Sequence, residues 1–169
     1  ESFLFLDTIK NNIRFGDFDA TDDEVVAAAK KSDLYADILD QPNQFDTEVG
    51  EQGVSLSGGQ RQRLAIARAL IINPEVLLLD DALSAVDGET EHAILQELRQ
   101  ERKDKTTIIA AHRLSSVMNA NEILVLDNGR IIQRGIHSQL VSQPGLYQDM
   151  FHRQQMETKI EKEGDLSAE

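Results

Sequence analysis

The sequence predicts an α/β fold with a parallel sheet and an α-helical part toward its N-terminal end. Residues 76–79 and 106–111 are two apolar runs, of the kind found in strands buried on both faces of a parallel sheet. The residues between them have helical spacing, and a helix is the usual crossover between parallel strands. Residues 1–50 contain helix and turn signals without a convincing strand, so we expect short helices and loops there.

Composition limits the class of protein. The chain has 169 residues, with 30 acidic against 17 strongly basic residues and a formal charge of -13, which suits one domain. Its longest apolar run, residues 25–29, is far shorter than the ~18 residues of a membrane helix. The acidic balance argues against a nucleic-acid partner, because phosphate binding depends on clustered Lys and Arg. The absence of Cys excludes disulfides, thiolate metal sites and Cys nucleophiles.

A capping box predicts the first long helix. The Thr21 hydroxyl and the Glu24 carboxylate can each bond an orphan amide at a helix start. We expect this helix to run from there to about residue 39. The sequence Gln41-Pro42-Asn43 then breaks it, and a glycine-bearing loop follows.

The middle of the chain carries signals for two more helices. One is expected over residues 60–72, with its apolar residues on one face and a breaker at residues 73–74. The other lies between the two predicted strands, where either Asp87 or Thr90 can supply the N-cap.

A hairpin and a last helix are expected toward the end of the chain. Asn128-Gly129 lies between two apolar runs and supplies the two positive φ angles of a tight turn. Residues 147–156 are expected to be helical, and the polar residues after them to fray.

The pentapeptide Leu56-Ser57-Gly58-Gly59-Gln60 is the strongest local signal for chemistry. A hydroxyl and two residues without Cβ at a helix start let backbone amides approach an anion under the positive end of the helix dipole. Taken alone, Ser-Gly-Gly also suits a flexible turn and an N-cap. With its continuation over residues 61–70, however, the segment resembles the signature motif of the ATP-binding cassette of ABC transporters.

This resemblance extends over nearly the whole chain and implies the fold class. It implies a P-loop NTPase-type (ABC cassette) parallel sheet with an α-helical subdomain, its N-terminal part missing. In this reading residues 1–56 are part of the helical subdomain, residues 57–151 are the C-terminal part of the RecA-like ATPase core, and residues 152–169 are a polar tail.

The P-loop that cradles the phosphates is absent from the sequence. Its pattern ends in Gly-Lys-Ser/Thr, and no Gly in the chain is followed by Lys. By resemblance, we expect the chain to begin just after the glutamine of the family's Q-loop. We also expect these residues alone to have negligible affinity for ATP and negligible turnover.

Two adjacent carboxylates follow the apolar run at residues 76–79. Asp80 matches the family's Walker B aspartate, and a carboxylate at a strand end can hold Mg²⁺ through water. Asp81 stands where the family has its catalytic Glu, and its side chain is one methylene, about 1.3 Å, shorter. Because a general base must reach the attacking water, the resemblance implies slow hydrolysis, as in the degenerate half of a heterodimeric exporter.

The same resemblance assigns the remaining site residues. His112 follows a predicted strand and matches the family's switch histidine, which contacts the γ-phosphate, although a lone His is more often structural. The residues from Ser84 to Asp87 resemble the family's D-loop. The candidate catalytic residues are Asp81 and His112, and the candidate ATP-binding residues are Ser57, Gly58, Gly59, Gln60, Asp80 and Asp87, with Asp80 also the Mg²⁺ residue.

The implied function is that of the ATP-binding and ATP-hydrolysing subunit of an ABC exporter of drugs, lipids or peptides. ATP and Mg²⁺ are the implied cofactors. A second cassette and a membrane-spanning domain are the implied partners, at the cytoplasmic face of the cell membrane. Ser57 and Gly59 would touch the nucleotide bound on the partner cassette.

Two alternatives remain open. In one, Asp81 makes the site a nucleotide clamp, in the catalytically weak half of a heterodimeric exporter. The other is a DNA-repair or chromosome-organising ATPase that shares the signature motif. Those proteins place long coiled coils or zinc hooks inside the cassette, and this chain has neither heptads nor Cys, so we rank this alternative lower.

Overall fold

The computed structural model describes residues 3–50 and 55–166, and its contacts divide the chain into two units, Glu1–Ala110 and Ala111–Glu169. Each unit is described by itself. The boundary expected after residue 56 therefore falls inside the first unit. Over the described ranges, no helix combines the length and the apolar character needed to cross a membrane.

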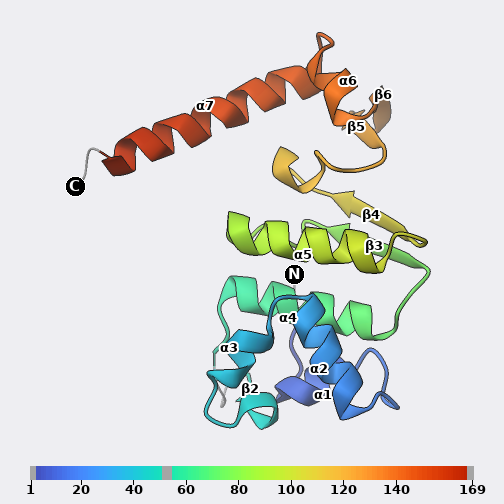
Figure 1. The fold of residues 1–169 in the computed structure, drawn as a ribbon, viewed down its shortest axis with the longest axis vertical. Helices are drawn as coiled ribbons and strands as arrows, with labels where there is room; N and C mark the ends of the chain where they lie inside the picture. Colours follow the sequence, from blue (N-terminus) through green and yellow to red (C-terminus); the bar gives the residue numbers. More distant parts are fainter. Residues whose placement is uncertain (1–2, 51–54, 167–169) are drawn as a thin grey trace. The chain divides into compact units, whose positions relative to one another are not determined.

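The first unit contains a helical layer and a small parallel sheet with its own helices (Figure 1). A two-residue antiparallel ladder, β1 with β2, joins the start of the unit to residues 48–49. The expectation of no strand in the first fifty residues is therefore wrong, because so short a ladder leaves no periodic pattern in the sequence. The elements are β1 Asp7–Thr8, α1 Ile9–Arg14, α2 Asp22–Lys31, α3 Tyr35–Leu39, η1 Gln44–Asp46, β2 Glu48–Val49, α4 Gly58–Ile71, β3 Val76–Asp80, α5 Gly88–Glu101 and β4 Thr106–Ala110.

The capping box at the start of α2 is confirmed, but the helix ends earlier than expected. Thr21 Oγ1 accepts the N–H of Glu24, and the Glu24 carboxylate accepts the N–H of Thr21 at 2.7 Å. α2 ends at Lys31, because Asp33 adopts a left-handed conformation with φ 54°. Asp tolerates this region better than most residues, and a second helix, α3, starts at Tyr35. The single helix expected to reach residue 39 is therefore two helices, α2 and α3.

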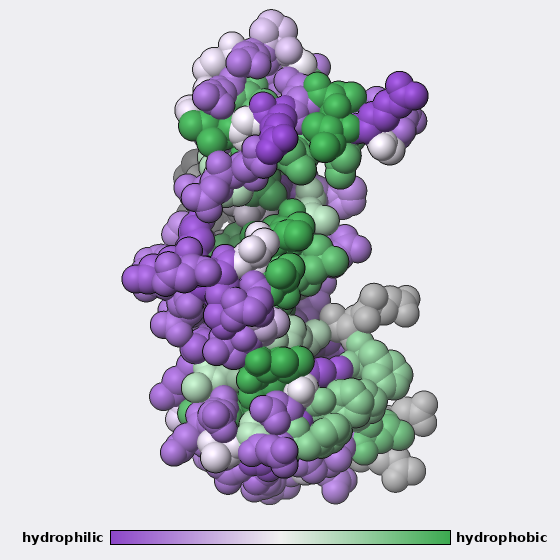
Figure 2. Space-filling model, turned by 90° about the vertical axis from the view of Figure 1, so that its right-hand side faces the viewer, coloured by the Kyte–Doolittle hydropathy of each residue, from purple (hydrophilic) through white to green (hydrophobic). Residues whose placement is uncertain are grey.

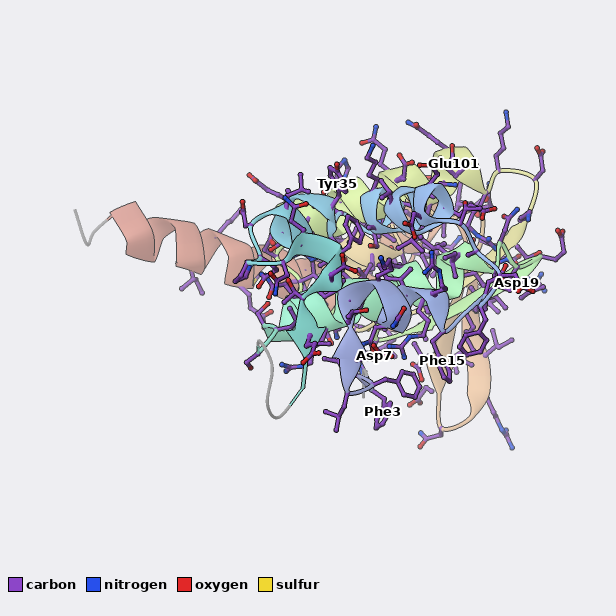
Figure 3. All side chains as sticks on the ribbon, turned by 90° about the horizontal axis from the view of Figure 1, so that it is seen from below. Phe3, Asp7, Phe15, Asp19, Tyr35 and Glu101 are labelled. Carbon is purple, nitrogen blue, oxygen red and sulfur yellow. The ribbon has the colours of Figure 1, made fainter. Side chains whose placement is uncertain are left out.

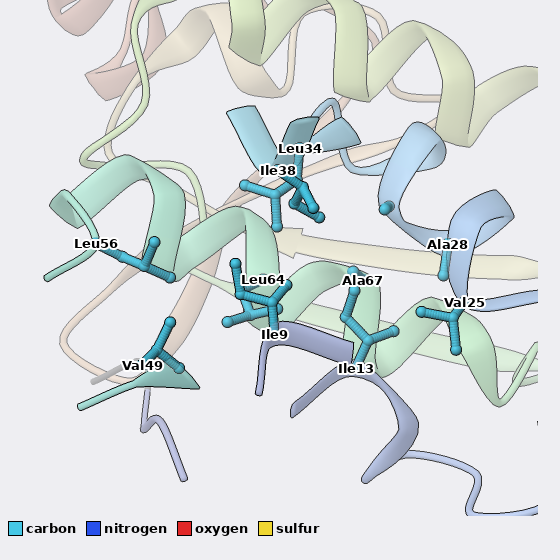
Figure 4. Packing of buried hydrophobic residues seen from close by; sticks show 11 residues of the cluster. Ile9, Ile13, Val25, Ala28, Leu34, Ile38, Val49, Leu56, Leu64 and Ala67 are labelled. Carbon is cyan, nitrogen blue, oxygen red and sulfur yellow. The ribbon is translucent and has the colours of Figure 1, made fainter. Parts of the chain in front are cut away.

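Helix α4 is buried on two sides. Leu64 and Ala67 face the helical layer, where they join a core formed with α1, α2 and α3 (Figure 4). Ile66 and Leu70 face the other way, into a second core with β3 and α5. The expectation of a single apolar face is thus too simple. As expected, the helix ends just before Asn73-Pro74.

Strands β3 and β4 are parallel, as the sequence predicts. Their register pairs Leu78 with Ile108 and Asp80 with Ala110. Burial alternates along β3: Leu77 and Leu79 are buried, whereas Leu78 is 63 % exposed. The expectation of a strand buried on both faces is wrong for the described residues, because α4 and α5 cover one face only. Apolar side chains are accordingly visible in green at the surface in Figure 2.

The second unit contains a hairpin and two helices after β4. The expected hairpin is confirmed: Asn128 and Gly129 have φ values of 47° and 75°, between Asp127 and Arg130, which pair. The last helix continues well past Met156, because its polar residues are good helix formers that need no burial. The elements are η2 Leu114–Ser116, β5 Ile123–Asp127, β6 Arg130–Gly135, α6 His137–Val141 and α7 Leu146–Leu166.

Gly16 provides a test of the packing between α1 and α4. A Cβ atom built on Gly16 would lie 2.2 Å from the backbone oxygen of Arg68, whereas one on Gly88 would meet nothing within 4 Å. We expect Gly16→Ala to lower the free energy of unfolding by about 1–3 kcal/mol, since overpacking of this kind displaces backbone. Gly88→Ala is the matched control and is expected to be neutral or slightly stabilising. Urea unfolding of the two variants measures the difference, and equal stability would contradict the packing described.

Candidate nucleotide site at the start of α4 and the end of β3

The start of α4 presents donors that suit an anion. Ser57 is the N-cap, and its Oγ accepts the N–H of Gln60 at 3.1 Å. The N–H groups of Gly58 and Gly59 lie in the first turn, where the helix itself offers no acceptor. The Ser57 hydroxyl keeps its own proton for donation. This helix end can therefore direct one hydroxyl and two amide donors at an oxyanion, with the helix dipole behind them.

Gln60 is engaged inside the chain. Its Oε1 accepts the N–H of Ser57 at 2.9 Å, which completes a capping box, and its Nε2 donates to Oδ1 of Asp37 at 2.8 Å. Arg63 binds the other oxygen of the same carboxylate at 2.8 Å. The side chain of Gln60 thus ties the start of α4 to α3. Gln60 therefore orients the start of α4. The donors that could bind a ligand there are those of Ser57 and the two glycines.

The two glycines pack against the loop between β3 and α5. A Cβ on Gly59 would lie 2.9 Å from the backbone oxygen of Ala85, and one on Gly58 would lie 3.3 Å from the Ala85 Cβ. Glycine is therefore required at residue 59 by a close approach inside the chain, independently of any ligand. Neither of the two roles expected from the sequence, anion binding and a flexible capped turn, includes this contact.

Asp80 and Asp81 emerge at the carboxyl end of β3, and both are exposed. The N–H of Asp81 donates to the backbone oxygen of Ala110 at 2.9 Å, which extends the β3–β4 pairing by one bond. Asp81 itself has φ 48°, a left-handed conformation that Asp adopts more readily than most residues. The backbone therefore turns sharply between the two carboxylates, and only Asp80 follows the direction of the strand.

Asp87 caps α5. Its Oδ1 accepts the N–H groups of Glu89 at 3.1 Å and of Thr90 at 3.0 Å, so of the two expected caps the structure selects Asp87. The hydrogen bond from the Thr90 backbone is the main reason that the pKa of Asp87 is lowered. One oxygen of this candidate nucleotide-binding residue is thus already used within the chain.

His112 lies in the second unit and is exposed. Its backbone is held by Gln154 of α7, whose Nε2 donates to the His112 oxygen at 2.8 Å and whose Oε1 accepts the N–H of Leu114 at 2.9 Å. Gln154 lies where the helix expected over residues 147–156 overlaps the polar tail expected from residue 152. The chain is helical there and on to Leu166, and Gln154 fixes the backbone of a candidate catalytic residue.

The residues present fit an ATP–Mg²⁺ complex in part. The donors of Ser57, Gly58 and Gly59 suit phosphate oxygens, and the exposed carboxylate of Asp80 suits a hard cation held through water. Among the described residues, no group of three or more His, Cys, Asp and Glu could hold a metal ion by itself. Mg²⁺ fits such a site, because it usually keeps several waters and binds phosphate oxygens with one or two carboxylates.

Sequence reasoning missed Gln62. Its amide binds the loop after β3 through Asp81, Ser84 and Ala85. Helical spacing places Gln62 on α4 but cannot show that a loop about twenty residues later folds back onto it. This contact is tertiary and leaves no pattern in the sequence.

Comparisons with known proteins identify the class. A model of the family described as ABC transporter matches residues 3–84. Fold and sequence agree with this match, because a solved structure of a bacterial Atm1-family ABC exporter with ATP bound superposes with a TM-score of 0.85 and 48 % sequence identity. That match covers 89 % of this chain and 27 % of the exporter chain. Residues 3–84 therefore belong to the ABC transporter family, and the chain has the ABC cassette fold of P-loop NTPases.

Relatives within this family are multidrug-type ATP-binding proteins. The chain is 54 % identical over 159 residues to the multidrug resistance-like ATP-binding protein MdlA of Escherichia coli (strain K12), covering 94 % of this chain and 27 % of MdlA. It is 50 % identical over 161 residues to the probable multidrug resistance ABC transporter ATP-binding/permease protein YheI of Bacillus subtilis (strain 168), covering 95 % of this chain and 28 % of YheI. The chain thus spans about a quarter of the length of these relatives.

The cap role of Asp87 predicts a specific dependence on pH. Asp87→Ala is expected to lower the stability of α5 at neutral pH, whereas Asp87→Asn keeps an acceptor for the cap. Because folding lowers the pKa of Asp87 below its ordinary 3.8, the charged cap stabilises fully above that value. This stabilisation disappears as the pH falls through the folded pKa. Urea unfolding at several pH values checks this, and an advantage of Asp87 over Asn that persists at the lowest pH would contradict it.

Proposed function

We propose that the chain is part of the ATP-binding and ATP-hydrolysing subunit of an ABC exporter. The observation that carries the proposal is the start of α4, where Ser57, Gly58 and Gly59 present donors at the N-terminus of a 14-residue helix. Exposed carboxylates follow the adjacent strand at Asp80 and Asp81. Family membership and the relatives' names support the same activity.

Each group of residues has a separate role in this proposal. Ser57, Gly58 and Gly59 bind the terminal phosphate of a nucleotide held by a second cassette, and their donors match the charge that develops there. Asp80 would hold Mg²⁺ through water, and the cation would neutralise phosphate charge. Asp81 accepts the proton of the attacking water, and His112 binds the γ-phosphate. ATP supplies the phosphoryl group and the driving force.

The proposal places the cassette on a membrane-spanning domain at the cytoplasmic face of the cell membrane, where ATP is available. Support comes from relatives whose names join an ATP-binding part to a permease, such as YheI. In this arrangement the membrane-spanning domain selects the exported substrate, and closing of two cassettes around ATP moves it. The 169 residues alone, without a P-loop, are not expected to bind or hydrolyse ATP.

An exposed aromatic surface on the first unit is our candidate for the contact with the membrane-spanning domain. Phe5 and Phe15 stack at 3.9 Å between ring centroids, and Phe3 and Phe18 pack edge-on against them. Phe3 and Phe15 are labelled in Figure 3. Phe3 is 67 % exposed and Phe18 is 73 % exposed. Arg68 of α4 lies 4.9 Å from the centre of the Phe5 ring, so this surface is attached to the helix that begins at Ser57. An apolar patch of this kind is typical of an interaction site.

A second candidate function is a nucleotide clamp that binds ATP while the partner cassette carries out hydrolysis. Asp81 favours it, because a shorter carboxylate reaches less far toward the attacking water. A DNA-repair ATPase is less well supported, since the relatives described above carry multidrug names.

A paired substitution tests the phosphate role of the glycines. Gly58→Ala alone brings a Cβ within 3.3 Å of the Ala85 Cβ, so loss of activity in this variant has two explanations. Ala85→Gly restores the space on the loop side. We expect ATP hydrolysis by the intact assembly to fall at least about tenfold in Gly58→Ala, because the added methyl group obstructs the approach of the phosphate to this backbone amide and one oxyanion contact is worth up to about 10²–10³. We expect Ala85→Gly not to rescue it. Full rescue would show that Gly58 serves the packing only.

Asp81→Glu in the intact assembly separates catalytic base from clamp. If the site is a clamp limited by reach, the added methylene is expected to raise turnover by about 10²-fold or more, the contribution of a well-placed general base. Steady-state ATP hydrolysis measures this, with the melting temperature as a control for the left-handed backbone at residue 81. Unchanged turnover in a stable variant would refute the clamp.

A further inference from the structure

Gln62 lies in the second turn of α4 and binds the loop between β3 and α5. Its Nε2 donates to Ser84 Oγ at 2.9 Å and to the backbone oxygen of Asp81 at 3.3 Å. Its Oε1 accepts the N–H of Ala85 at 2.8 Å. The interaction uses both the donor and the acceptor of a primary amide. Among side chains, only those of Gln and Asn contain this group.

The loop is also attached to the hydrophobic core through its buried residues. Leu83 and Val86 are 6 % and 3 % exposed and belong to the core formed with α4 and α5. Asp81, Ser84 and Ala85 are exposed. Gln62 therefore binds the loop at its solvent-facing residues, where the hydrophobic core does not hold it.

The same loop is in contact with the start of α4. Gly58 and Gly59 approach Ala85 closely enough that a Cβ on either residue would crowd it. Ser84 Oγ also donates to the backbone oxygen of Asp81 at 2.9 Å, so the atoms that Gln62 binds are bonded to one another. A shift of the loop would thus change the positions of Asp81 and of the glycine turn together.

We propose that Gln62 is a positioning residue that fixes the segment from Asp81 to Ala85 against the first turns of α4. It thereby joins the carboxylate that serves this cassette's nucleotide to the donors that serve the partner's. This inference rests on the proposed function for its catalytic consequence, but its structural part concerns this chain alone. Asp81 and the donors at the start of α4 then move together when the cassettes close.

Hydrogen exchange tests the structural part. In the intact nucleotide-free assembly, Gln62→Ala removes the acceptor of the Ala85 amide, and this amide is expected to exchange about fivefold to tenfold faster, the factor of one to two ordinary hydrogen bonds. Gln62→Glu keeps an acceptor and loses the donor, so it is expected to give a smaller increase. Gln96→Ala, an exposed glutamine of α5, is the matched control. Unchanged exchange over residues 81–87 in Gln62→Ala would overturn the proposal.

Steady-state kinetics test the catalytic part on the same variants. We expect Gln62→Ala to lower kcat about fivefold to tenfold with KM for ATP and the melting temperature little changed, since the loop is misplaced and not unfolded. Faster exchange with unchanged kcat would overturn the positioning role. Failure of the proposed function gives a different result from failure of the exchange test or of the kcat test. It appears as full ATP hydrolysis in the Gly58→Ala, Ala85→Gly double variant. The exchange measurement does not depend on it, because it is made without nucleotide.

Discussion

The burial of α4 on two sides is the constraint on which the first unit depends. Leu64 and Ala67 belong to the helical core, and Ile66 and Leu70 belong to the core of the sheet. A helix that contributes to two cores cannot rotate without disturbing both, because interiors are close-packed. Its N-terminus, where Ser57 and the two glycines lie, therefore has a fixed direction relative to β3 and to the helical layer. The direction of the donors at this helix end therefore follows from packing farther along α4.

Polar contacts transmit the same constraint to the surface. Arg68, near the end of α4, donates to the backbone oxygen of Asn12 at 2.9 Å and to that of Phe3 at 3.0 Å, and its burial lowers the pKa of its guanidinium. Gln60 and Arg63, near the start, hold Asp37 of α3. The aromatic surface is thus attached near the end of α4, and Ser57, Gly58 and Gly59 lie at its start. Such an element is what a membrane-spanning domain would need to sense the state of a nucleotide site.

Local chemistry decided what could be predicted from the sequence. The capping box at Thr21 and the Asn128-Gly129 turn depend on residues close together in the chain, and the β3–β4 pair on two apolar runs joined by a helical crossover. All three are present. The break at Asp33 was missed because α2 and α3 together have a nearly continuous helical composition, and one left-handed residue is enough to separate them. The exposed face of β3 was missed because an apolar strand gives no sign of what covers it. The candidate site residues were assigned by family resemblance, whereas Gln62 and Gln154, which contact them or their loops, could not be predicted because their interactions are tertiary.

In the proposed function, Gly58 and Gly59 at the start of α4 satisfy two requirements at once. Approach of a phosphate needs amides unobstructed by side chains, and the loop after β3 needs the same absence, because the backbone oxygen of Ala85 would lie 2.9 Å from a Cβ on Gly59. The second requirement holds within one chain, before any nucleotide or partner is present. A glycine pair in this turn is therefore insufficient evidence of phosphate binding by itself. In the proposed function, phosphate binding depends on the combination of these amides with the hydroxyl of Ser57 and with a helix end whose direction two cores fix.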